Sequence, residues 1–372
     1  MNRHVTSLPI PNHLKTKLVK NGIESVTELK NLRPTDLIKD FGFTRTEVSE
    51  LYETLDMYKS IKSMSVFELL QQKTDKSNFI KTLTPGLDKI LGGGLPLGKI
   101  SELCGAAGVG KTQVCMQLCV NVQIPEVFGG LGAKAIYIDT EGSFMSNRVV
   151  EIFNATGNLL KQNFNLNNRN ELIKHNFTID KILSNIFYYR CVDHVQLLAC
   201  FNNIKILMEK HPQIKLVVID SLAYPFRFVD FKDSNSMTMK TNILNNIMSI
   251  SYELINKYNI AILVTNQMTT RITRDVMSNL SSSNLVPALG ETWAHSANLR
   301  ILLSWKNSKR QASVCKSSYL PDTSIFYKIT ERGFEDEFLE NDSNDTIKNN
   351  TNAFLNDSDF TNAQIKRKKF DD

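Results

Sequence analysis

The sequence is poor in the features of secreted, zinc-binding and membrane proteins. Its six cysteines form no CxxC pair, which argues against a zinc site or a disulfide framework, so we expect buried, reduced thiols; they stand at positions 104, 115, 119, 191, 200 and 315. No apolar run approaches the roughly 20 residues that span a bilayer, and no segment of signal-peptide type follows Met1. We therefore expect an intracellular, soluble protein with no membrane contact.

Charge of one sign is in only slight excess. The chain of 372 residues carries 44 Lys and Arg against 38 Asp and Glu, a formal net charge of +6. Spread over this length, the excess is a weak indication of an anionic partner such as nucleic acid. With 42% hydrophobic and 22% charged residues, the composition is that of a globular chain, long enough for one large domain and a small one.

Residues 1–58 have the pattern of a small helical domain. Gly22 stands where a helix is expected to stop and Ser25 where one is expected to start, while Thr44 and Glu47 have the spacing of a capping box. A helix-hairpin-helix arrangement of this kind can hold a DNA backbone through its loop amides, or it can dock a partner protein. The sequence leaves both roles open.

Residues 81–335 alternate strand-like and helical patterns. Several of the strand-like runs are apolar throughout, as strands buried on both faces are: ISELCG, AIYIDTEG, IFYYRC, LVVIDS, IAILVTNQ and LRILLSW. The alternation predicts an α/β fold with a largely parallel twisted sheet, whose ligands bind at the carboxyl ends of the strands. Residues 59–80 are expected to form a linker, and the Asn-rich stretch 158–178 a surface insertion of no catalytic meaning.

Residues 336–372 form a tail that is rich in Asp, Asn, Ser and Thr and has too few apolar residues to order itself. Near its end, residues 366–369 are a compact basic run that is typical of a nuclear import signal, although a solvated charge run has the same composition. The tail therefore favours a nuclear location.

The most specific motif is GAAGVGKT, which follows a strand-like run and opens a helix. Gly105 and Gly110 let the backbone turn its amides toward phosphate groups, and the following helix directs its positive end at them. The Lys111 ammonium can reach the terminal phosphates, and the Thr112 hydroxyl can bind magnesium. The motif predicts a site for ATP and Mg²⁺ made of Gly105, Ala106, Ala107, Gly108, Val109, Gly110, Lys111, Thr112 and Gln113.

Polar residues end three of the predicted strands. Asp220 closes LVVIDS, where a carboxylate belongs to the coordination of magnesium beside a phosphate loop. Glu141 follows AIYID and can orient the attacking water, with Asp139 as the competing residue. Asn266 and Gln267 end IAILVTNQ, where an amide can sense the terminal phosphate.

Five segments, taken in order, resemble the eukaryotic branch of the RecA-like strand-exchange recombinases: PGLDKILGGGLPLGKISELCGAAGVGKTQ, YIDTEGSF, LVVIDS, TNQMTT and PALGETWAHSANLRILL. Further details such as VQIPEVFGG and AYPFRF resemble most closely the C paralogue group, whose members act as mediators of recombination. The resemblance implies a RecA-type ATPase core behind a small helical domain, slow DNA-dependent ATP hydrolysis and ATP-dependent binding to single-stranded DNA. It also implies assembly with other recombinase paralogues in a hetero-oligomeric complex.

The resemblance further implies roles for individual residues. The catalytic set is Lys111, Glu141, Asp220 and Gln267, with Thr112 and Asp220 at magnesium. Arg148, in SFMSNR, matches a position that stacks on the adenine. Two DNA-facing loops, 222–241 and 268–290, carry the residues expected to meet DNA: Arg227, Lys232, Arg271 and Arg274.

Two departures from the family pattern bear on assembly. Lys316 stands where the main recombinases have an acidic residue that reaches a neighbouring subunit's nucleotide through a cation, so we expect its ammonium to cap a partner's phosphates. Residues 66–69 read VFEL where an FxxA sequence joins subunits of the main recombinase, which argues against long filaments of this chain alone.

The function expected from the sequence is that of an ATP-dependent, single-stranded-DNA-binding mediator in homologous recombination and double-strand-break repair, with the main recombinase filament as a further partner. Two alternatives are a self-polymerising strand-exchange recombinase and a RecA-type ATPase that does not act on DNA. The linker argues against the first alternative. The helical N-terminal domain and the basic C-terminal run argue against the second.

Overall fold

The computed structural model describes residues 4–57, 65–68, 78–165, 170–227, 234–274 and 281–337. The chain divides into two compact units, Met1–Asp75 and Lys76–Asp372. The basic run at residues 366–369 lies outside the described residues. In the part of the chain that is described, no helix has the length and apolar character needed to cross a bilayer.

The first unit consists of short helices around a core of its own. Its elements are η1 (Val5–Ser7), α1 (Asn12–Lys20), α2 (Val26–Asn31), α3 (Pro34–Lys39) and α4 (Arg45–Met57). The predicted helix starts are confirmed, because Ser25 forms a capping box with Glu28 and Thr44 exchanges hydrogen bonds with Glu47. Gly22 follows α1 at a φ of 75°, a left-handed conformation that glycine adopts without strain. Apolar side chains of all four α-helices form the core.

The second unit is built on a nine-stranded sheet in the order β13-β12-β11-β10-β3-β7-β6-β4-β5. The six strands from β10 to β5 are parallel and the other three are antiparallel, which confirms the α/β class and the largely parallel sheet. The strands are β3 (Ile100–Gly105), β4 (Lys134–Asp139), β5 (Ile186–Arg190), β6 (Ile214–Asp220), β7 (Ala261–Asn266), β10 (Leu299–Lys306), β11 (Lys309–Ser317), β12 (Ser324–Thr330) and β13 (Gly333–Asp336). A separate short pair joins β1 (Phe79–Ile80) to β2 (Leu95–Pro96).

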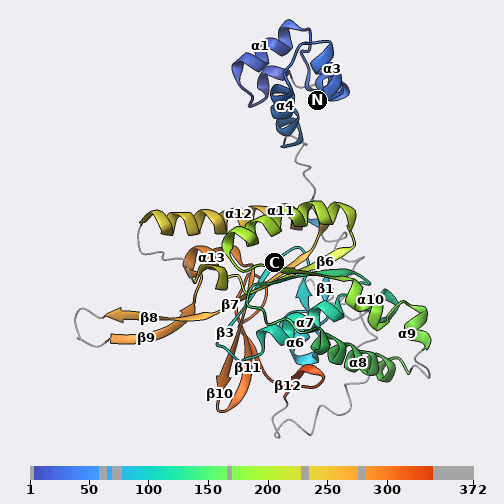
Figure 1. Ribbon diagram of the computed structural model, residues 1–372, viewed down its shortest axis with the longest axis vertical. Coiled ribbons are helices and arrows are strands. Elements are labelled where there is room, and N and C mark those ends of the chain that lie inside the picture. Colours follow the sequence, from blue (N-terminus) through green and yellow to red (C-terminus); the bar gives the residue numbers. More distant parts are fainter. Residues whose placement is uncertain are drawn as a thin grey trace, which may run out of the picture. The chain divides into compact units, whose positions relative to one another are not determined.

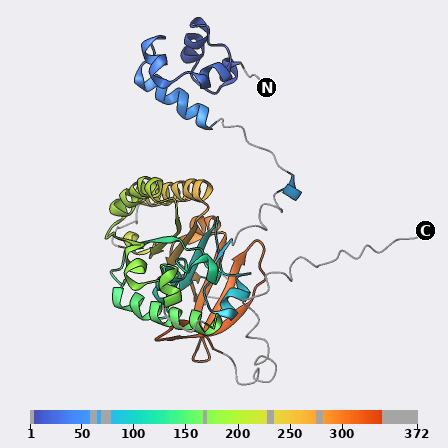
Figure 2. The same ribbon diagram turned by 90° about the vertical axis from the view of Figure 1, so that its right-hand side faces the viewer.

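Helices cover both faces of this sheet, as Figures 1 and 2 show. Residues of α6 (Pro85–Ile90), α7 (Lys111–Asn121), α8 (Ser146–Asn163), α9 (Asn170–Lys174) and α10 (Ile179–Ser184) pack in the first core. Residues of α11 (His194–Lys210), α12 (Ser234–Tyr258) and α13 (Gly290–Ser296) pack in the second core. Neighbouring residues of a central strand therefore enter different cores: Leu263 of β7 lies in the first and Val264 in the second.

Two expectations from the sequence are wrong. The stretch 158–178 is not a surface insertion, since α8 continues into it and Leu160, Leu172 and Phe177 are buried in the first core. Its many asparagines concealed these apolar anchors. Cys315 is exposed whereas the other five cysteines are buried; it lies on β11 between the partly or fully buried Val314 and Lys316.

Asp88, in the first turn of α6, is an enclosed carboxylate. Its Oδ1 accepts a hydrogen bond from the Thr82 amide at 2.8 Å. Burial raises the pKa of Asp88 to about 6, against the opposing effect of that hydrogen bond. The folded chain thus binds this proton more tightly than the unfolded chain does, and the stability that protonation contributes is lost as pH rises through the folded pKa.

We predict that Asp88→Asn, which keeps an acceptor and removes the charge, raises the free energy of unfolding by about 1 to 3 kcal/mol at neutral pH. The gain should shrink as the pH falls toward 5. Denaturant unfolding at a series of pH values measures this difference, and the exposed Asp322→Asn serves as control. A variant that is less stable than the parent at neutral pH would contradict the prediction.

Candidate nucleotide site

The phosphate loop connects β3 to α7. Gly108 and Gly110 have φ values of 79° and 104°, a region in which any other residue is strained. Gly105 is required for another reason, because a Cβ there would lie 2.5 Å from the Leu303 carbonyl oxygen. Val109 is buried, and its carbonyl accepts a hydrogen bond from the Tyr327 hydroxyl. Its side chain therefore packs in the core and does not face the exposed side of the loop. The tip of the loop is exposed and consists of Ala106, Ala107 and Gly108.

The first two residues of α7 carry the groups expected to meet phosphate and magnesium. The Lys111 ammonium donates to the carbonyl oxygens of Gly105 and Ala106, each at 2.9 Å, and burial lowers the pKa of Lys111. The Thr112 hydroxyl donates to Asp220 Oδ2 at 2.7 Å. The helix start and the end of β6 are thereby joined at the place where magnesium is expected.

Asp220 is the buried centre of the site, with 1% of its surface exposed. Its carboxylate accepts hydrogen bonds from three hydroxyls: Thr112 at 2.7 Å, Tyr137 at 2.8 Å and Thr265 at 2.6 Å. Burial raises the pKa of Asp220, the three hydroxyls oppose that rise, and nearby Glu141 adds to it. The three donors fix the orientation of a carboxylate that would otherwise be costly to keep ionised.

The structure separates the roles of Asp139 and Glu141. Asp139 is fully buried, and it accepts the backbone N–H groups of residues 141–144 at 2.7 to 3.3 Å and the Tyr188 hydroxyl at 3.1 Å. Its oxygens shape the turn after β4. Glu141 Oε1 accepts instead from the Ser221 hydroxyl at 2.6 Å and from Gln267 Nε2 at 2.5 Å. This geometry favours Glu141 over Asp139 as the group that orients water.

Asn266 and Gln267 face opposite ways. The Gln267 side chain points to Glu141, and the Gln267 carbonyl oxygen accepts from the Ala288 amide at 2.8 Å. Asn266 Nδ2 donates to Glu102 on the other face of the sheet at 2.7 Å. Of the two amides at the end of β7, only Gln267 therefore faces the nucleotide edge.

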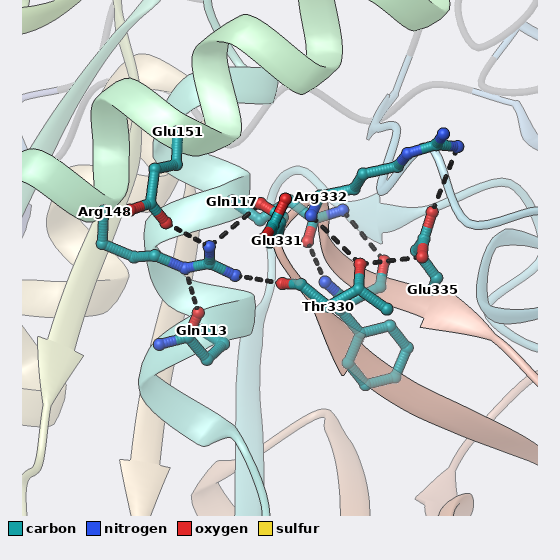
Figure 3. A network of polar contacts seen from close by, with 9 residues as sticks. Gln113, Gln117, Arg148, Glu151, Thr330, Glu331, Arg332 and Glu335 are labelled. Atoms are coloured by element: carbon teal, nitrogen blue, oxygen red, sulfur yellow. Dashed lines mark hydrogen bonds and ion pairs between the residues drawn. The ribbon is translucent and has the colours of Figure 1, made fainter.

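Arg148 lies in the polar network of Figure 3. Its Nε donates to Gln113 Oε1 at 2.7 Å and its Nη1 to Glu151 at 2.5 Å. The same guanidinium donates to the carbonyl oxygens of Thr330, at the end of β12, and of Glu331, in the turn before β13. These bonds use the edge of the guanidinium, so stacking on adenine, which uses its face, stays a prediction.

The residues expected to meet DNA are only partly described. Arg227 is exposed just after η3 (Tyr224–Phe226). Lys232 lies outside the described residues. So do the side chains of Arg271 and Arg274, although their backbones belong to β8.

The two loops predicted to face DNA contain regular structure. Most of 268–290 is an antiparallel hairpin of β8 (Met268–Arg274) and β9 (Ser281–Pro287), and α12 begins at Ser234, inside 222–241. The loop interpretation is wrong for the described residues of these segments, from which residues 228–233 and 275–280 are excluded. β-branched residues recur in β8, as Thr269, Thr270, Ile272 and Thr273, and favour extended structure there, whereas β9 has only Val286 of this kind.

Sequence reasoning missed three residues of the site. Tyr137 and Thr265 donate to Asp220, and Ser221 donates to Glu141. The sequence could have indicated Tyr137 and Thr265, because residues two apart in a strand lie on the same face of the sheet. Tyr137 precedes Asp139 by two residues, and Thr265 precedes Gln267 by two.

The chain is similar to known proteins over most of its length. A family model described as Rad51 matches residues 75–337, a span that contains every residue of the candidate nucleotide site. The chain is 36% identical over 360 residues to the DNA repair protein RAD51 homolog 3 of Cricetulus griseus, which covers 93% of this chain and 95% of the relative. It is 37% identical over 280 residues to the protein of the same name in Dictyostelium discoideum, covering 75% and 71%.

We predict that Tyr137→Phe shifts the pH dependence of Mg²⁺-dependent ATP binding. Loss of the hydroxyl removes one of the hydrogen bonds that lower the pKa of Asp220, so the carboxylate protonates at a higher pH. The pH midpoint below which affinity is lost should therefore rise. Titrations with a fluorescent ATP analogue measure the midpoint, which Tyr252→Phe on α12 should leave in place. An unchanged midpoint in Tyr137→Phe would refute the role of Tyr137.

We also predict that Lys111→Ala weakens ATP binding at least about tenfold, because the ammonium expected to contact phosphate is lost. The ligand-free melting temperature should change by no more than about 2 °C, since no packed apolar group is removed. Calorimetric ATP titration and thermal unfolding test the two parts, with the exposed Lys89→Ala as control. A large fall in melting temperature without nucleotide would instead assign Lys111 a structural role.

Proposed function

Because the chain belongs to the Rad51 family, we propose that it is an ATP-dependent, single-stranded-DNA-binding paralogue that mediates homologous recombination and double-strand-break repair. The observation that carries the proposal is the Glu141–Gln267 hydrogen bond at 2.5 Å. It links Glu141, which we propose orients water, with Gln267, the residue that immediately precedes the hairpin β8–β9. Both relatives are named as DNA repair proteins, which supports the repair context.

The site has the groups that binding and hydrolysis of ATP require. The loop amides and Lys111 would hold the phosphates, while Thr112 and Asp220 would hold magnesium, which supplies positive charge beside the transferred phosphate. Glu141 would orient the attacking water through its carboxylate. Ser221 and Gln267 both donate to Glu141, and these bonds would fix the direction in which its carboxylate faces the water.

Gln267 would couple the nucleotide to DNA. Its carbonyl accepts a hydrogen bond from the Ala288 amide at the base of the hairpin. If the Gln267 side chain turned from Glu141 to a terminal phosphate, the movement would therefore reach both ends of the hairpin. Arg271 and Arg274 on β8 would then meet the DNA backbone. Hydrolysis would remove the phosphate that Gln267 senses and release the strand.

Other recombinase paralogues are the proposed partners, in a hetero-oligomeric complex that acts on the main recombinase filament. The VFEL sequence at residues 66–69 argues against filaments of this chain alone. The basic run at residues 366–369 supports action in the nucleus.

We predict that the purified chain binds a labelled single-stranded oligonucleotide more tightly with ATP and Mg²⁺ than without. Contact with the backbone releases counterions, so a plot of log affinity against log salt should have a slope of about −2 or steeper, equivalent to three or more phosphates. Fluorescence anisotropy across a salt series measures both effects. Binding that depends on neither nucleotide nor salt would contradict the proposal.

Gln267→Ala separates the two halves of this function. It should leave ATP affinity within about threefold of the parent and abolish the ATP-induced gain in DNA affinity, because a sensing residue reports occupancy without supplying most of the binding. The exposed Gln162→Ala on α8 is the matched control. Joint-molecule formation by the chain alone would favour the strand-exchange alternative, and no DNA binding under any condition would favour the ATPase that does not act on DNA.

A further inference from the structure

A charged cluster lies inside the second unit, on the face of the sheet away from the phosphate loop. At its centre, Glu102 of β3 is completely buried. Glu102 Oε2 accepts from Arg300 Nε on β10 at 2.7 Å, and its Oε1 accepts from Asn266 Nδ2 on β7 at 2.7 Å. A carboxylate in the core is costly unless it is paired and hydrogen-bonded, and here both oxygens are. The hydrogen bonds of Glu102 thus go to residues other than those expected to bind ATP or magnesium.

This cluster reaches the nucleotide edge through the end of β7. Asn266 and Gln267 are neighbours that point to opposite faces of the sheet, Asn266 toward Glu102 and Gln267 toward Glu141. A hydrogen bond that holds the Asn266 side chain therefore also fixes the backbone from which Gln267 extends. Glu102 holds the end of β7 from the face of the sheet away from the phosphate loop, while the nucleotide would act on Gln267 from the opposite face.

A β-bulge extends the cluster to α13. Arg300 pairs with Lys316, but Ile301 pairs with Val314, so Cys315 is the extra residue on β11. The bulge turns Lys316 to the face that carries Arg300, instead of the face that Val314 shares in a regular strand. The Lys316 ammonium donates to the carbonyl oxygens at the end of α13, those of Ala294 at 2.6 Å, His295 at 3.2 Å and Ala297 at 2.6 Å.

The contacts of Lys316 are those of a helix C-cap. The last carbonyls of a helix lack partners within the helix and carry partial negative charge, which an ammonium offsets. All three of its N–H groups are used within the chain, so the expectation that Lys316 caps a partner's phosphates loses its support. Trp293, 2% exposed, anchors α13 in the second core beside these carbonyls.

The two ends of the hairpin β8–β9 therefore connect to one cluster. The first end follows Asn266, which Glu102 holds, and the second end leads into α13, which Lys316 holds. Arg300 lies between the two, bonded to Glu102 and paired with Lys316 across the β10–β11 ladder. The hydrogen bond from the Ala288 amide to the Gln267 carbonyl closes the base of the hairpin.

We propose that Glu102, Arg300 and Lys316 are positioning residues that couple occupancy of the nucleotide edge to the hairpin β8–β9 and α13. The cluster holds the end of β7 and the end of α13 in fixed positions, so a movement at Gln267 is transmitted to β8, β9 and α13 together instead of being absorbed at one end. The inference rests on the proposed nucleotide site, and it deepens the proposed switch.

Hydrogen exchange of the full-length chain, read by mass spectrometry without DNA, tests the coupling. In the parent, ATP with Mg²⁺ should slow exchange in segment 268–296. Lys316→Met keeps the apolar stem and removes the ammonium, and Glu102→Gln keeps an acceptor for Asn266 and removes the charge opposite Arg300. Each should leave ATP affinity within about threefold of the parent and reduce the ATP-induced protection by about half or more.

Two further variants separate coupling from general stability. Lys309→Met, also on β11, removes an ammonium that pairs with Glu337 outside the cluster and should preserve the protection in full. The double variant Glu102→Gln/Lys316→Met should lose no more protection than the more affected single variant, since both act through one cluster. Should Glu102→Gln fail to fold, Lys316→Met decides the question alone.

Several results would overturn the inference: full protection in Lys316→Met, equal loss in Lys309→Met, additive losses in the double variant, or a parent chain in which ATP leaves segment 268–296 unchanged. Because the readout needs no DNA, failure of the proposed function is a separate outcome. A parent that shows ATP-induced protection and cluster dependence, yet binds no oligonucleotide, would remove the DNA role and keep the coupling.

Discussion

The arrangement of the nucleotide site depends on the hydrogen bonds that hold the buried carboxylate of Asp220. Asp220 accepts hydrogen bonds from Thr112 at the start of α7, from Tyr137 on β4 and from Thr265 on β7. These three donors come from three elements, so the carboxylate fixes the phosphate-loop helix against the centre of the sheet. Without them, desolvation would favour the neutral acid, which binds magnesium poorly. The same bonds thus stabilise the packing and oppose the protonation of Asp220, the proposed magnesium ligand.

Strand alternation then divides the work between the two faces of the sheet. On one face, Thr265 and Gln267 turn to Asp220 and Glu141; on the other, Asn266 turns to Glu102. Hydrogen bonding on both faces holds the end of β7 in a defined position. The proposed response of Gln267 to a phosphate requires such a fixed strand end. The hairpin β8–β9 begins just after Gln267, which makes this strand end the natural point of transmission.

The sequence predicts those features whose signals are local. The phosphate loop, Asp220, Glu141 and the apolar strands of the parallel sheet all follow from short motifs and runs. The antiparallel strands β11 to β13 were missed, because each buries only part of its surface and shows no apolar run. The cluster around Glu102 could not be predicted. Its geometry depends on a bulge at Cys315, and on strand neighbours that lie almost 200 residues apart in the chain, as Glu102 and Arg300 do.

Nucleotide binding would act on the hairpin through Gln267, and this proposed coupling connects the nucleotide site, the proposed DNA function and the buried cluster. The most direct measurement is a high-resolution structure of the full-length chain with Mg²⁺ and a slowly hydrolysed ATP analogue. The account predicts phosphates within the loop 105–112, magnesium beside Thr112 and Asp220, and the Gln267 side chain turned from Glu141 to the terminal phosphate. A bound nucleotide that leaves the Glu141–Gln267 hydrogen bond and the hairpin unchanged would contradict it.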